Sequence, residues 1–376
     1  MPLTVLLPTL TSILAFLFAL LLLDQWLERR HGFQAVWCFG MVCFGLGSGA
    51  EAVAAINGWS EPLYRTWYLT GAVWTAGWLG LGTAFLLGRT RFGYTYAVLL
   101  LLSGLVALMI RNSPTYAGSG PLPLLYLIGA VILALAIGVE TYFQNDSWPR
   151  FAAGAIVGVT ILSIVLMVLT PPLTAPGYAL SPTGQPVGDA MPGYLRLLTP
   201  VMNIPGALSL LLGAVFSTYV FMPKKRVLPY SLDPNQPGDQ FLFNLFIAPV
   251  AIVVNLIASL PVAFRELMAG RLHSRVPATI LIALGAFFPT ITDSLNRAGS
   301  TELFQLGKFL GVVLLFAGFL VSVEVFREIR VPFTSVRLAT ARRERPRPAD
   351  AEAATETDVE SGAEPGDAPH GATVRS

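Results

Sequence analysis

The chain has 376 residues, of which 54% are apolar and only 12% charged, and its mean hydropathy is +0.64. A soluble domain of this size usually carries about 25% charged residues, so the composition excludes a soluble globular protein and fits a chain surrounded mostly by lipid. The net charge of +2 is spread between apolar segments and forms no continuous basic face, so no nucleic-acid partner is expected.

The two cysteines and the N-terminus add little chemistry. Cys38 and Cys43 stand five residues apart in one apolar segment and would point to different helix faces, so neither a disulfide nor a metal pair is expected. The first 23 residues lack a basic start and a small-residue cleavage site, and Arg29 and Arg30 follow them. This pattern predicts a retained membrane helix with the N-terminus outside.

Ten segments approach the roughly 20 apolar residues that a membrane-spanning helix needs. Their sequences show no alternation of polar and apolar residues, which a membrane β-barrel would require. The expected fold is therefore all-α, a polytopic membrane helical bundle of nine or ten membrane segments. The segments are 4–23, 34–56, 63–87, 94–110, 121–143, 151–170, 200–222, 241–264, 276–292 and 303–326.

The segment from Phe241 to Phe264 conflicts with the positive-inside rule. Basic residues collect on the internal side of the first seven helices, but a basic cluster at 224–226 precedes this segment and three more arginines follow it at 265–275. Both clusters stay internal if the segment enters and leaves on one side, and Pro249 and Pro261 would favour such a re-entrant hairpin. The alternative is a plain crossing helix with tolerated prolines.

The expected organisation has three parts. A seven-helix bundle with an external N-terminus covers 1–222, three further membrane segments cover 223–330, and a disordered cytoplasmic tail covers 331–376. Six prolines mark an external loop at 171–199. The basic patch from Arg337 to Arg347 is either a contact with anionic lipid or only a topological signal. Small-xxx-small pairs such as Gly45/Gly49 and Gly154/Gly158 permit close helix approach and a homo-oligomer.

Glu51 and Arg65 are candidate site residues because ionisable side chains inside a bilayer are costly. They lie near the external ends of two consecutive helices joined by a short loop, so an ion pair between them is geometrically plausible. Such a pair could gate an external vestibule or bind a charged group. The alternative is a purely structural ion pair near the interface.

Aromatic residues mark the third segment. Trp67, Gly71, Trp74 and Trp78 follow helical spacing and would share one face. The deeper Trp74 and Trp78 could wall a pocket for an apolar or cationic ligand. The alternative is that they face lipid or pack between helices.

Three further polar residues complete the candidate site. Asn244 and Asn255 offer amide groups at membrane depth within 241–264. Lys308 lies about five residues into the last expected helix, near Glu302 and Gln305. We expect its side chain to snorkel toward the interface. Asp293 and Arg297 are spaced for a helix-surface ion pair.

No enzyme motif is recognisable, since the P-loop, HExxH, GxSxG and CxxC patterns are all missing, and no cofactor is expected. The embedded charges and broken helices favour a transporter or channel-like protein for a small solute or ion. Over 4–222 the layout of seven helices is similar to the sensor portions of bacterial membrane receptors, in layout alone. This similarity implies the alternative, a membrane sensor or scaffold that recruits a separate partner. The expected location is the plasma membrane, as in a bacterial inner membrane.

Overall fold

The computed structural model describes residues 2–173, 190–232, 237–269, 275–297, 301–322, 329–330 and 337–338, with side chains except at 292–297, at 301–302 and in the last two pairs. The expected Asp293–Arg297 pair and almost all of the 337–347 patch and the tail lie outside this description. The elements are α1 (Leu3–Arg29), α2 (Gly32–Asn57), α3 (Glu61–Trp67), the π-helical η1 (Tyr68–Trp74), α4 (Thr75–Leu86), α5 (Phe92–Ile110), the 3₁₀ turn η2 (Pro114–Tyr116), α6 (Leu122–Tyr142), α7 (Trp148–Leu169), α8 (Gly193–Arg196), α9 (Leu198–Phe221), α10 (Gly238–Met268), α11 (Arg275–Arg297), α12 (Thr301–Val321), β1 (Ile329–Arg330) and β2 (Arg337–Leu338).

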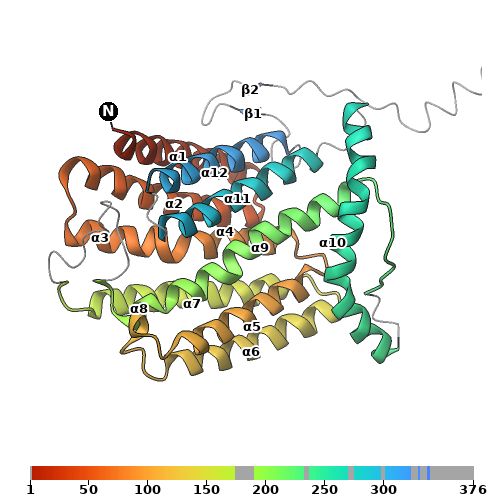
Figure 1. Cartoon of the computed structure of the whole chain (residues 1–376), viewed down its shortest axis with the longest axis horizontal. Coiled ribbons are helices and arrows are strands. Elements are labelled where there is room, and N and C mark those ends of the chain that lie inside the picture. Colours follow the sequence, from red (N-terminus) through yellow and green to blue (C-terminus); the bar gives the residue numbers. More distant parts are fainter. Residues whose placement is uncertain are drawn as a thin grey trace, which may run out of the picture.

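The expected all-α polytopic bundle is confirmed. Nine described helical segments are long and apolar enough to cross a membrane, and α11 adds a shorter apolar helix. All lie side by side except α10, which runs across one end of the bundle (Figure 1). The strands β1 and β2 form only a two-residue antiparallel pair, with Ile329 opposite Leu338.

The helices from 275 to 321 pack into the same bundle as the first seven. α11 lies against α9, and α12 lies against α1 (Figure 1). Phe18 of α1 contacts the rings of Phe316 and Phe319 of α12, with centroids 5.1 and 4.9 Å apart. The last two helices therefore share a core with the N-terminal helices.

Glycine allows close contacts at the centre of the bundle. A Cβ added to Gly206 of α9 would lie 2.3 Å from the carbonyl oxygen of Ala76 on α4. The Gly45 and Gly49 face packs against Phe16 and Ser12 of α1. The same spacing on α7 faces open space, since nothing lies within 4 Å of a Cβ added at 154 or 158. The Gly45/Gly49 pair therefore serves close packing between two helices of one chain.

Basic residues gather where α1, α4, α6, α9 and α12 end and α2, α5, α7 and α11 begin. We call this end of the bundle the basic end; α10 lies there (Figure 1). Its described members are Arg29, Arg30, Arg89, Arg91, Arg150, Lys224, Lys225, Arg226, Arg265 and Arg275.

The expected re-entrant hairpin is wrong. The residues from Phe241 to Phe264 lie in one continuous helix that contains both Pro249 and Pro261. Each proline removes one backbone donor, but a single missing hydrogen bond does not reverse the chain when the flanking turns keep helical geometry.

Candidate functional site

Glu51 is the centre of a buried polar cluster near the end of the bundle opposite the basic end. Its Oε2 accepts hydrogen bonds from the Lys308 ammonium at 2.7 Å and from the Gln305 amide at 2.9 Å. Its Oε1 accepts one from the Trp67 indole at 2.8 Å. Only 4% of the Glu51 side chain and 11% of the Lys308 side chain are exposed. The carboxylate is therefore shielded from the surroundings of the protein, and both of its oxygens accept hydrogen bonds.

Three elements supply this cluster. Gln305 and Lys308 are three residues apart on α12, so both reach the same side of that helix. Trp67 is the last residue of α3, directly before the π-helical turn η1. Ser48 lies one turn before Glu51 on α2, and its buried hydroxyl has no partner among the described atoms, like the Gln305 carbonyl oxygen.

The Glu51–Lys308 ion pair is electrically neutral, which is the condition for keeping two charges at membrane depth. Desolvating an ion costs several kcal/mol, and an apolar pair of similar volume is often more stable. Intramembrane ionisable groups are therefore functional candidates. The expectation that Lys308 snorkels is wrong, because its ammonium bonds Glu51 inside the bundle.

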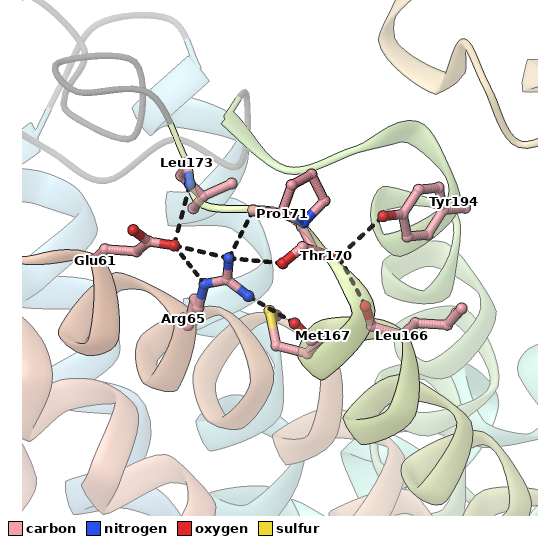
Figure 2. Close-up of polar contacts among 8 residues, drawn as sticks. All are labelled: Glu61, Arg65, Leu166, Met167, Thr170, Pro171, Leu173 and Tyr194. Carbon is pink, nitrogen blue, oxygen red and sulfur yellow. Dashed lines mark hydrogen bonds and ion pairs between the residues drawn. The ribbon is translucent and has the colours of Figure 1, made fainter.

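The expected Glu51–Arg65 pair is also wrong. Arg65 pairs with Glu61 at 2.7 Å and donates to the backbone carbonyls of Met167 at 2.6 Å and Thr170 at 3.1 Å (Figure 2). Residues two apart on a helix differ by about 200° in direction. Trp67 therefore faces α2, whereas Arg65 faces the end of α7.

Arg65 has a capping role that the sequence did not indicate. The last carbonyls of a helix lack partners within the helix, and a cation beside them is favourable. Figure 2 shows Glu61 orienting the guanidinium while it also accepts the Leu173 amide at 3.0 Å. Arg65 joins α3 to the end of α7 and does not contribute to the Glu51 cluster.

Trp74 and Trp78 pack between helices. Their indoles donate to Ser163 at 2.8 Å and to Thr160 at 3.2 Å, both on α7. The expected common face with Trp67 is wrong, because η1 winds more loosely than an α-helix and shifts the residues that follow it. The indole N–H groups are satisfied by α7, so these residues do not converge on Glu51.

Asn244 and Asn255 lie far from Glu51, on α10. Asn255 is fully buried, and its Oδ1 accepts the amides of Val227 at 2.7 Å and Leu228 at 2.9 Å. Asn244 accepts the Ser231 amide at 3.4 Å. Both amides hold the chain that connects α9 to α10, which is a structural role.

Sequence reasoning did not single out Trp67, Gln305 or Asn203 as site residues. Gln305 was detectable by its spacing from Lys308 and Trp67 by its spacing from Trp74, but nothing local marked Asn203. Asn203 of α9 donates to the Ala72 carbonyl in η1 at 2.9 Å, and its buried Oδ1 has no described partner. Irregular turns leave backbone groups that polar side chains of other helices can satisfy.

A small cavity of about 30 Å³ lies between α2, α4, α9 and α11, toward the basic end. Its lining residues include Thr83, Ser217 and Thr279, but the surface that they present to it is almost entirely apolar. A cavity of this volume is about the size of one water molecule and too small for a larger solute. In the part of the chain that the structure describes, no three His, Cys, Asp or Glu residues gather closely enough to hold a metal ion.

Fold and site together define an integral multi-pass helical membrane protein with a buried intramembrane ion pair. Comparisons with protein-family models, curated proteins and solved structures give no match to this chain.

Proposed function

We propose that the protein is a transporter or channel-like protein for a small solute or ion, and that Glu51 and Lys308 form its gate. The observation that carries the proposal is the buried Glu51–Lys308 ion pair with its additional donors Gln305 and Trp67. Charges at membrane depth mark substrate and ion pathways, and they are expensive where stability alone is needed.

The pair connects α2 to α12. Protonation of Glu51, or competition by a charged solute for Lys308, would remove the attraction that holds these helices together. The partnerless Ser48 hydroxyl and Gln305 carbonyl would then be available to a solute. In this proposal the closed state is the one in which the two charges neutralise each other. The basic end would face the cytoplasm, with the protein in the plasma membrane.

A second candidate is a sensor or scaffold that recruits a separate partner. The dense packing of glycines favours it, since a Cβ on Gly80 would lie 2.3 Å from the Gly206 carbonyl oxygen at the bundle centre. The Glu51 cluster and the small cavity also lie in different parts of the bundle. A protein that only transmits a shape change needs no continuous solute path.

Accessibility of position 48 separates the two candidates. Ser48→Cys is placed in a chain with Cys38→Ala and Cys43→Ala, and sealed vesicles of both orientations are treated with a charged methanethiosulfonate reagent. Transport requires the cluster to open to each side in turn, so the introduced thiol should react from both sides. The matched control, Ala84→Cys, lies in the packed core and should not react.

The transport proposal fails if the thiol introduced at position 48 is protected from both sides, or reacts from one side only, in both the native-pair chain and a Glu51→Gln chain. Protection in both chains would instead support the sensor or scaffold, whose bundle stays dry.

A further inference from the structure

On α10 the large apolar side chains are exposed, and most of the buried ones are small or polar. A helix packed on the core of a soluble protein shows the opposite arrangement. Large apolar side chains form its exposed stripe at spacings of three, four and seven residues. They include Phe243, Phe246, Val250, Ile257, Leu260 and Phe264. An exposed apolar stripe of this length does not face water in a stable protein.

The buried stripe of α10 consists mostly of small side chains, three alanines together with the polar Asn255 and Ser259. Ser259 accepts the Lys225 amide at 2.8 Å, and Asn255 binds the backbone of Val227 and Leu228. The chain between α9 and α10 thus lies along the buried stripe. Figure 1 shows this connecting chain on the side of α10 that is away from the bundle. The side of α10 that carries Asn255 and Ser259 is covered by this loop, whereas its large apolar side chains are exposed.

Both termini of α10 contact the basic end of the bundle. Near its start, Phe241 meets the rings of Tyr94 at 6.0 Å and Tyr142 at 5.5 Å, at the start of α5 and the end of α6. Near its end, Ala263 packs with Met222 and Val276, beside the end of α9 and the start of α11. A helix that crossed the membrane would place its two termini at opposite ends of the bundle.

We infer that α10 lies in the plane of the membrane at the basic end, with its apolar stripe embedded in the acyl chains of the lipids. This inference does not depend on the proposed function. Amphipathic helices of this kind bury one face at the boundary between headgroups and acyl chains.

Basic residues near the C-terminal end of α10 complement anionic headgroups at the same level. Lys224 lies over the Tyr219 ring at 5.4 Å and Arg275 over the Phe221 ring at 4.2 Å, while Arg265 is exposed in the last turn. The helices that the start of α10 contacts, α5 and α6, also expose large apolar side chains. This shared apolar exposure favours lipid over a second copy of the chain as the occupant.

The depth of spin labels along the stripe tests the inference. Labels are placed one at a time at Phe243, Val250, Ile257 and Phe264, which are seven residues apart, in a chain with Cys38→Ala and Cys43→Ala. The protein is reconstituted in phosphatidylethanolamine and phosphatidylglycerol vesicles. Depth is measured from accessibility to oxygen, which enters lipid, relative to a water-soluble nickel chelate.

An in-plane helix should give four nearly equal depths, each more accessible to oxygen than to nickel. The matched control uses α6, where Leu125, Ile132 and Val139 are also exposed and seven residues apart. The control labels span about 21 Å along a crossing helix and should differ strongly in depth.

Three results would overturn the inference. A steady depth change over about 32 Å along α10 would show a crossing helix. Higher accessibility to nickel than to oxygen would place the stripe in water. Immobile labels inaccessible to both reagents would show that a second chain covers the stripe.

Discussion

At the scale of single residues, direction around a helix decides which charges meet. Arg65 and Trp67 are two positions apart, yet one binds the end of α7 and the other donates to Glu51. Glu51 takes its cation from α12, 257 positions away along the chain. The intrinsic cost of an embedded carboxylate made Glu51 a candidate site residue, but local sequence could not select its partner.

A double-mutant cycle tests the Glu51–Lys308 pair. Breaking a buried pair from one side leaves an uncompensated charge, so Glu51→Gln and Lys308→Met should each lower the free energy of unfolding by about 3–5 kcal/mol. The double substitution removes both charges and should cost less than the sum of the two. Thermal unfolding in detergent micelles provides the measurement.

Arg65 supplies the control for this cycle. Glu51→Gln combined with Arg65→Gln should be additive, because Arg65 pairs with Glu61 and contacts α7. Coupling between Glu51 and Arg65, or additivity between Glu51 and Lys308, would contradict the described pairing.

At the scale of elements, the π-helical η1 and the glycine contacts determine how closely helices approach. Gly47 and Gly71 meet where η1 passes α2, and a Cβ on Gly47 would lie 2.8 Å from the Gly71 Cα. Glycine content predicted close packing, but not which pairs of helices use it. The Gly45/Gly49 face packs on α1, whereas the pair on α7 stays open.

A single methyl group tests the contact between α4 and α9. Gly206→Ala should lower the free energy of unfolding by about 1–3 kcal/mol, because the added Cβ meets the rigid backbone at Ala76. Gly129→Ala on α6 is the matched control, since nothing lies within 4 Å of its Cβ position. It should cause no loss, and helix propensity even favours alanine. Thermal unfolding measures the stability of both variants. Equal losses of stability in the two would exclude a close contact between α4 and α9.

At the scale of the whole molecule, the placement of α10 explains why basic clusters both precede and follow it in the sequence. Because both of its ends contact the basic end, α11 starts on the side where α9 ends (Figure 1). The clusters before and after α10 therefore lie on one side without any hairpin. The positive-inside rule then predicts that this side faces the cytoplasm.

Cysteine labelling on intact cells tests that orientation. In a chain without Cys38 and Cys43, Ala269→Cys at the end of α10 should react with an impermeant maleimide only from the cytoplasm. Ser60→Cys, exposed between α2 and α3 at the opposite end, should react only from outside. Permeabilised cells, in which both should react, give the reference. Labelling of the Ala269→Cys chain from outside would reverse the orientation.

The sequence by itself determined the class of protein and the location of its helices. Long apolar runs cannot be solvated by water, and a backbone in lipid must satisfy its own hydrogen bonds, so composition alone dictates membrane helices. Each of the ten expected segments lies largely within a described helix. The charge pattern also correctly identified the segment from Phe241 to Phe264 as exceptional, although it predicted the wrong shape.

Only the tertiary structure decided which helices meet and which polar groups pair. Lipid-facing and protein-facing surfaces are equally apolar, so hydropathy does not distinguish a crossing helix from one lying across the bundle end, as α10 does. Ion pairs depend on helix rotation, which a π-helical turn such as η1 changes without a sequence signal. For these reasons the Glu51–Lys308 pair and the placement of α10 emerge only when helices distant in sequence are packed together.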